Sequence, residues 1–152
     1  MEHGTLEREI HIEATPEVVF SVISDPAHVQ EWWPDEADFD ATPGGNGRLT
    51  WNDPEGPKVV SLTVVAAEPG RLFSFRWTHP AGEAAAPGNS LLVTFELSPT
   101  ATGTLLRMTE TGFREMGWEV AALEETYRDH VTGWEHYLPR LTEYAARLAA
   151  AR

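Results

Sequence analysis

A long helical repeat near the C-terminus is the feature that most constrains the fold of this chain. Between residues 120 and 148 apolar side chains recur every three or four positions, which is the spacing of one face of an amphipathic helix. These positions are Val120, Leu123, Tyr127, Val131, Trp134, Leu138, Leu141, Ala145 and Leu148. Pro139 lies inside the repeat and predicts a kink there, or a break after Tyr137, because proline lacks the N–H of a helical hydrogen bond. A helix with one apolar face needs an apolar surface to cover.

That surface is predicted to be an antiparallel sheet. Residues 6–13 alternate between apolar and polar, as a half-buried strand does. Further strands are expected near residues 37–41, 47–53, 58–68, 70–78, 90–98 and 103–111. Short connections rich in proline and glycine separate most of them, which is typical of hairpins. Residues 79–89 lack apolar anchors and are expected to form a mobile loop.

Two short helices are predicted after the first strand. Thr15 followed by Pro16 has the chemistry of a helix N-cap with proline at the first helical position. A second short helix or turn is expected from Pro26 to Trp33. The order of elements predicts an α+β fold, with one curved antiparallel sheet of about seven strands around the long helix. We expect residues 1–152 to form a single domain, since no linker or repeat divides the chain.

Composition and charge exclude several classes of protein. The chain has 24 acidic and 11 basic residues and a formal net charge of −13, which repels phosphate backbones and makes nucleic acid an unexpected partner. It contains no cysteine, so disulfides and thiol chemistry are excluded. No apolar run approaches the roughly 18 residues of a membrane span, and the N-terminus lacks a signal-peptide pattern. We therefore expect a cytoplasmic protein without a membrane span.

Six tryptophans in 152 residues indicate either a bulky core or an aromatic cavity. Strand alternation places Trp51 and Trp77 on the face that meets the long helix, together with most other large apolar residues of the strands. Trp32 and Trp33 are expected to tie the short helices over one end, with at most one of them facing inward. The pattern assigns no role to Trp118.

Several segments in order along the chain resemble the START-like, helix-grip superfamily (SRPBCC). They include residues 14–20, Asp25-Pro26 followed by Trp32-Trp33, and the turn at residues 44–47. The remaining segments are residues 71–77, 103–106 and 133–138. Within that superfamily the chain is similar to the family of activator of heat-shock protein 90 ATPase homologues. The resemblance covers nearly the whole chain and implies a helix-grip (START/Bet v 1-like) fold with a hydrophobic cavity between the C-terminal helix and the sheet.

The resemblance implies that the cavity binds a small hydrophobic molecule, such as an aromatic, polyketide-like or lipid-like compound. It also suggests a role in the stress response and a chaperone or other protein as a partner. The chaperone activator itself has a separate N-terminal domain, for which 152 residues leave no room, so we expect ligand binding rather than chaperone stimulation. The alternatives are a cyclase or hydrolase acting on such a ligand, and a chaperone-related interaction module.

Candidate cavity residues are the inward-facing aromatic, apolar and ionisable side chains of the strands and the long helix, with one tryptophan from the end of the second short helix. They are Trp33, Trp51, Phe75, Trp77, Phe95, Met108, Glu110, His130, Trp134 and Leu138. Arg8 and His79 are possible polar handles for a ligand. Arg8 and Glu110 share the inward phase, and a helix-grip sheet pairs its first strand with its last, so they are expected to form an ion pair.

Catalytic and metal chemistry receive little support from the sequence. His79, His130 or Glu110 could act as acid or base in a cyclisation, although solvated histidines are the simpler expectation. His130 and His136 are six residues apart and lie on different helical faces, and no HExxH motif is present. We therefore expect a binding protein rather than an enzyme, without assigned catalytic residues, a metal or another cofactor.

Overall fold

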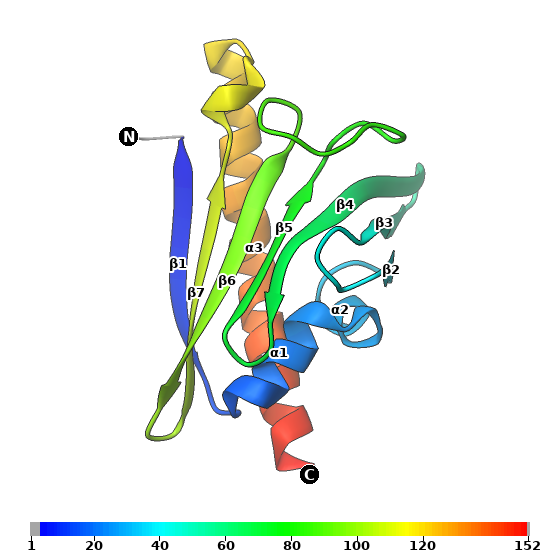
Figure 1. Cartoon of the computed structure of the whole chain (residues 1–152). Coiled ribbons are helices and arrows are strands. Elements are labelled where there is room, and N and C mark those ends of the chain that lie inside the picture. Colours follow the sequence, from blue (N-terminus) through cyan, green and yellow to red (C-terminus); the bar gives the residue numbers. More distant parts are fainter. Residues whose placement is uncertain (1–3, 152) are drawn as a thin grey trace.

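The computed structural model describes residues 4–151, which form one seven-stranded antiparallel sheet and a layer of helices (Figure 1). The strands are β1 (Thr5–Ile12), β2 (Glu36–Phe39), β3 (Asn46–Asp53), β4 (Gly56–Glu68), β5 (Leu72–Trp77), β6 (Leu91–Thr100) and β7 (Gly103–Thr111). Their order is β1-β7-β6-β5-β4-β3-β2, so the predicted meander from β2 to β7 is confirmed and β1 pairs with β7. The predicted domain limits at 1 and 152 lie outside the described residues.

The helices are α1 (Pro16–Ser24), α2 (Pro26–Trp32) and α3 (Val120–Ala150), with a 3₁₀ turn η1 (Arg114–Met116) before α3. Thr15 caps α1 as predicted, because its hydroxyl accepts a hydrogen bond from the Val18 N–H. Asp25 caps α2 in the same way through the Ala27 N–H. Figure 1 shows the sheet curving around α3, with α1 and α2 at one end of the sheet.

Pro139 does not end the long helix. α3 runs without interruption from Val120 to Ala150, so the alternative of a break after Tyr137 is wrong. Proline removes one intrahelical hydrogen bond, and the apolar side chains on both sides of it hold the helix in place. Leu138 and Leu141 are both buried against the rest of the core.

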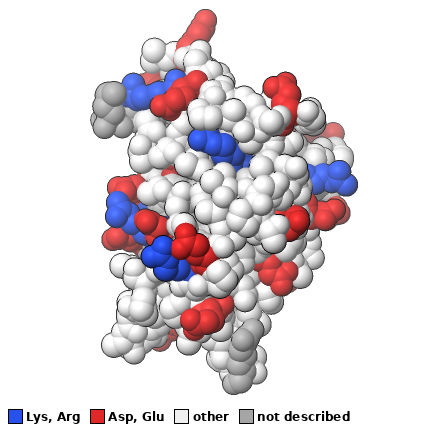
Figure 2. Space-filling model, in the orientation of Figure 1, with Lys and Arg blue, Asp and Glu red and all other residues white. Residues whose placement is uncertain are grey.

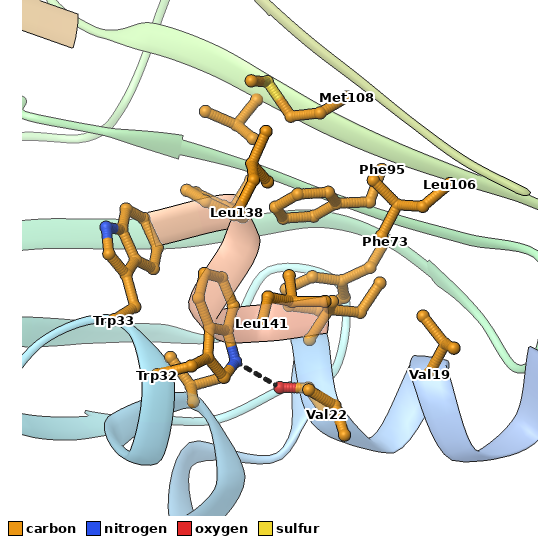
Figure 3. Close-up of a cluster of buried hydrophobic side chains, with 14 of the residues drawn as sticks. Val19, Val22, Trp32, Trp33, Phe73, Phe95, Leu106, Met108, Leu138 and Leu141 are labelled. Carbon is orange, nitrogen blue, oxygen red and sulfur yellow. Dashed lines mark hydrogen bonds between the residues drawn. The ribbon is translucent and has the colours of Figure 1, made fainter. Parts of the chain in front are cut away.

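The inner face of the sheet and the apolar stripe of α3 form the core, as predicted from strand alternation. Phe73, Phe95, Leu106 and Met108 of the sheet converge with α3 in Figure 3 and are fully or almost fully buried. Trp32 packs beside them, and its Nε1 donates a hydrogen bond of 2.9 Å to the Val22 carbonyl. This bond ties α2 to α1, as expected for one of the two adjacent tryptophans.

One end of the sheet is split. β5 pairs with β4 only as far as Trp77, which lies opposite Leu62, whereas β4 continues back to Gly56. At Thr78 the chain turns away into the loop that leads to β6. Asn89 organises that loop by accepting from the Ala86 N–H and donating to the Ala84 carbonyl. The mobility of residues 79–89 stays a prediction. The split between β4 and β5 leaves one end of the sheet open beside β4.

Candidate ligand pocket

A cavity of about 750 Å³ lies between α3 and the split end of the sheet. Its walls come from the end of β3, the first half of β4, the end of β5 with residues 78–81, and residues 126–137 of α3. Beyond this part of α3, Leu141 and Ala145 are buried and no longer line the cavity. The volume is that of a pocket for a drug-sized molecule.

Four tryptophans form the apolar wall: Trp33, Trp51, Trp77 and Trp134, here called the pocket tryptophans. The ring of Trp33 lies at their centre, with centroid distances of 5.9 Å to Trp51, 5.0 Å to Trp77 and 5.1 Å to Trp134. Trp51 keeps its orientation by donating from Nε1 to the Tyr137 hydroxyl at 3.1 Å. The planes of Trp51, Trp77 and Trp134 are inclined to that of Trp33 by 80°, 55° and 34°. Indoles inclined in this way offer both faces and edges to a flat apolar ligand.

Gly133 opens the wall on the helix side. It lines the cavity, and a Cβ at this position would meet nothing within 4 Å outside its own stretch of helix. Glycine inside a helix is less stable than alanine by roughly 0.5–1 kcal/mol. The helix thus gives up stability at a position where a side chain would occupy the pocket.

Glu110 lies behind the tryptophans and is completely buried. Its carboxylate accepts hydrogen bonds from Trp77 Nε1 at 2.8 Å, Trp134 Nε1 at 2.9 Å and His130 Nδ1 at 2.9 Å. The donors satisfy a charged group that would otherwise be costly to bury. Glu110 thereby fixes the orientation of two pocket tryptophans and of His130, which also lines the pocket.

The expected ion pair between Arg8 and Glu110 is wrong. In the β1–β7 register Leu6 lies opposite Glu110, and Arg8 lies opposite Met108. The long Arg8 side chain instead reaches the edge of α3, where its guanidinium lies 3.4 Å from the Glu135 carboxylate. Strand alternation placed Arg8 on the correct face, but the side chain reaches toward solvent rather than into the interior.

Thr78 and His79 form a polar end of the pocket. Thr78 has a positive φ of 70°, which is rare for a β-branched residue. His79 is only 7% exposed, so the expectation of a solvated histidine is wrong there. Burial lowers the pKa of His79 below its ordinary value, and the attraction of Glu83 opposes this effect. Both residues line the cavity, so any polar group of a ligand at this end would meet them.

The structure brings half of the predicted site residues to the pocket surface. The pocket tryptophans, His79 and His130 line it. Phe75, Phe95, Met108, Glu110 and Leu138 are buried behind the lining. Arg8 lies away from the lining. Whether any of these residues binds a ligand stays a prediction.

Sequence reasoning missed Thr78, Gly133 and Lys58, which also line the pocket. An isolated glycine inside a strong helical repeat is a signal that could have identified Gly133. Lys58 is the only lysine in the chain, and its position at the start of β4 places it at the pocket. Nothing in the local sequence marks Thr78, because its backbone conformation depends on where β5 stops pairing.

Within residues 4–151 no group of three or more histidine, aspartate or glutamate side chains is arranged to hold a metal ion. None of the helices in the same part of the chain is both long and apolar enough to cross a membrane.

Known proteins with this architecture support the family resemblance. A search of curated proteins found no match. A Mesorhizobium loti protein of solved structure is 28% identical, with a TM-score of 0.73, over 94% of this chain and 97% of that one. A Nitrosomonas europaea protein is 16% identical, with a TM-score of 0.78, over 99% of both chains.

The fold is also that of the Aha1 dimer from Colwellia psychrerythraea, which is 16% identical, with a TM-score of 0.70, over 93% of this chain and 96% of that one. The family model described as activator of Hsp90 ATPase homolog 1-like protein matches residues 13–146. The chain therefore belongs to the family of activator of Hsp90 ATPase homolog 1-like proteins.

Proposed function

We propose that residues 1–152 act as one domain that binds a small, flat, largely apolar molecule in the pocket between α3 and the sheet. The observation that carries this proposal is the cavity itself, in which four indoles face a gap kept open by Gly133. A chain selected only for a stable core would fill that gap, because alanine or leucine suits the helix better. Stacking on the pocket tryptophans would supply most of the affinity.

Surface charge favours an uncharged ligand. On the face of the molecule seen in Figure 1, acidic and basic side chains are scattered and form no basic stripe (Figure 2). The lining contains two carboxylates, Asp53 and Asp129, and one cation, Lys58. Because the protein has a net charge of −13, it would repel an anionic ligand over Debye-length distances.

Filling the gap tests the proposal. Gly133→Leu places a side chain in the cavity at a position where the backbone has space and leucine is a better helix former. We expect a panel of naphthalenes, flavonoids and fatty acids to include ligands that quench the tryptophan fluorescence of the natural protein. For those ligands Gly133→Leu should weaken binding at least about tenfold, which corresponds to roughly 1.4 kcal/mol.

Thr132→Leu is the matched control, because Thr132 is exposed on the same turn of α3 and does not line the cavity. It should bind like the natural protein. Flat titrations of the natural protein with the whole panel, or equal affinities of Gly133→Leu and Thr132→Leu, would contradict the proposal.

The contact between Glu110 and His130 favours a second candidate function, an enzyme that uses a general base. Glu110 holds Nδ1 of His130, and Nε2 makes no hydrogen bond to any of residues 4–151. A histidine oriented by a buried carboxylate is a common general base, and such a base contributes roughly 100- to 10,000-fold to a rate. A ligand with an acidic C–H beside Nε2 would be its substrate.

5-Nitrobenzisoxazole tests this candidate, because it is flat, apolar and opened by a base. Nε2 would take the C3 proton while the N–O bond breaks and its electron pair stays on oxygen as a cyanophenolate. We expect His130→Phe to lose roughly 100-fold in rate, as for the loss of a general base. His11→Gln, a change at an exposed position of β1, should have no effect. Turnover by His130→Phe at the natural rate would exclude His130 as the base.

No specific observation favours a chaperone-binding surface over the pocket. In the described part of the chain the exposed large apolar residues are Val59, Val65 and Val120, which are spread over β4 and the start of α3. Trp118 is half-buried and packs against the core. A role in the stress response likewise rests on the family alone.

A further inference from the structure

One pocket tryptophan has an indole N–H without a hydrogen-bond partner. The other three pocket tryptophans all donate theirs, one to the Tyr137 hydroxyl and two to the Glu110 carboxylate. Trp33 lies at the centre of the group, and its Nε1 donates to no atom of residues 4–151. Polar groups of buried side chains are nearly always paired in folded proteins, so an unpaired one calls for a reason.

The free N–H of Trp33 meets open space rather than the core. Trp33 is only 6% exposed, and it lines the cavity. Within the described residues the side-chain atoms that are both sealed and unpartnered are Thr78 Oγ1 and His79 Nδ1, so Trp33 Nε1 is open to a water-sized molecule. In Figure 3 this nitrogen lies on the edge of the ring that points away from Trp32 and Leu138. Because so buried a side chain meets open space where it lines the cavity, the N–H is presented to whatever occupies the pocket.

Neighbouring rings and the end of α2 hold the Trp33 indole in place. One face stacks on Trp32, with ring centroids 5.7 Å apart and an interplanar angle of 10°. The centroids of Trp77 and Trp134 lie 5.0 Å and 5.1 Å away. The backbone N–H of Trp33 donates a hydrogen bond of 3.0 Å to the Val29 carbonyl. A donor that is fixed before binding loses little freedom when it pairs with a ligand.

The partner of this N–H must be a hydrogen-bond acceptor, because an indole nitrogen donates and does not accept. A negatively charged acceptor is disfavoured by two neighbouring carboxylates. Glu110 lies behind Trp77 and Trp134, and Asp129 lines the cavity. A carbonyl oxygen is an uncharged acceptor that a flat aromatic molecule can carry.

Building on the proposed function, we propose that Trp33 determines which flat aromatic molecules bind, by donating its indole N–H to an uncharged acceptor such as a carbonyl oxygen. The ring of the same ligand would lie against the other pocket tryptophans. A hydrocarbon of the same shape would displace water from the N–H and leave this donor unpaired. The pocket would therefore prefer aromatic carbonyl compounds to the matching hydrocarbons.

Two ligands of the same shape test this role. 2-Acetylnaphthalene and 2-isopropenylnaphthalene differ only in that a CH₂ group replaces the carbonyl oxygen. Equilibrium dialysis with absorbance of the free ligand gives both dissociation constants without using tryptophan fluorescence. The readout is the constant of the hydrocarbon divided by that of the ketone, because differences in their solubility in water cancel when variants are compared. We expect Trp33→Phe to lower this ratio about fivefold or more, as for one lost hydrogen bond.

Trp51→Phe is the matched control, because it removes another indole of the pocket whose N–H is already paired with Tyr137. Both ligands should bind this variant less tightly, with the ratio of the natural protein. Replacing Trp33 by 3-benzothienylalanine keeps a bicyclic ring and exchanges the N–H for sulfur, so it should lower the ratio as Trp33→Phe does. This replacement provides the test if Trp33→Phe does not fold by circular dichroism.

The outcomes separate the role of Trp33 from the pocket itself. An unchanged ratio in a folded Trp33 variant would overturn that role while the pocket proposal stands. An equal fall of the ratio in Trp51→Phe would also overturn it, because the effect would then not come from the free N–H. Failure of both naphthalenes to bind the natural protein would overturn it and count against the proposed function as well.

Discussion

At the scale of single residues, the pocket is marked by two side chains of a kind that is uncommon in a protein core. Thr78 adopts a strained backbone conformation and carries an unpartnered hydroxyl. Glu110 is a carboxylate with no exposed surface. Such features are uncommon in a core and are concentrated at functional sites. Both lie at or directly behind the lining of one cavity.

Thr78→Gly should stabilise the protein. Glycine accepts a positive φ without strain and removes the unpartnered hydroxyl, and these gains exceed the greater chain entropy of glycine, for a net gain of about 1–2 kcal/mol. Urea unfolding measures the change. Thr78→Val separates the causes, because it removes the hydroxyl and keeps the strain. A lower free energy of unfolding for Thr78→Gly would show that the left-handed turn is not strained.

The free energy of unfolding should decrease as the pH falls, because His79 takes up a proton less readily in the folded protein than in the unfolded chain. Burial lowers its pKa in the folded state, whereas an unfolded histidine titrates near 6.5. The unfolded state therefore binds the proton first as the pH falls below about 6.5, and folding loses free energy from there toward the folded pKa. Glu83 opposes the shift, and Asp53, Asp129 and Lys58 line the same pocket.

Urea unfolding of the natural protein and of His79→Gln over this pH range measures the effect. The natural protein should lose stability more steeply than the variant below about pH 6.5. Parallel curves would show that His79 titrates alike in both states.

At the scale of elements, α3 has two different parts: an apolar face that packs in the core, and a stretch around Gly133 that leaves space for the pocket. Its second half buries Leu138, Leu141 and Ala145 against the core. Its first half faces the split between β4 and β5, where Gly133 and His130 line the pocket. The helix therefore anchors the fold at one end and forms a wall of the site at the other.

Gly133→Ala should raise the free energy of unfolding by about 0.5–1 kcal/mol, because alanine loses less chain entropy in a helix and its methyl group meets no neighbour. Thermal or urea unfolding checks the change. The single methyl group should reduce ligand affinity less than Gly133→Leu does. A destabilised Gly133→Ala would mean that the wall closes at this position.

Periodicity predicts the elements better than it predicts the site. Alternation along β7 predicts that Glu110 points inward, and the spacing of three or four residues between apolar positions of α3 predicts the same for Trp134. Both predictions succeed because strand alternation and helical spacing are local properties of the sequence. The partner of Arg8 and the strain at Thr78 depend on register and on where β5 stops pairing with β4. Those features arise from contacts between distant segments, and no local pattern encodes them.

At the scale of the whole molecule, the pocket results from a sheet that is wider than one helix can cover. The sheet curves around α3 in Figure 1, and its split end extends past the buried half of the helix. Aromatic side chains from β3, β5, α3 and the residue that follows α2 gather in this space. Of the six tryptophans, four line the cavity, Trp32 ties the short helices together and Trp118 packs at the edge of the core.

The indole N–H signals of the protein test the binding pocket most directly. A ¹⁵N-labelled sample has one such signal for each of its six tryptophans, and 2-naphthol can be titrated against them. We expect the signals of the pocket tryptophans to shift together with one affinity, while those of Trp32 and Trp118 stay in place. Six unmoved signals, or shifts confined to Trp32 and Trp118, would contradict a ligand pocket between α3 and the sheet.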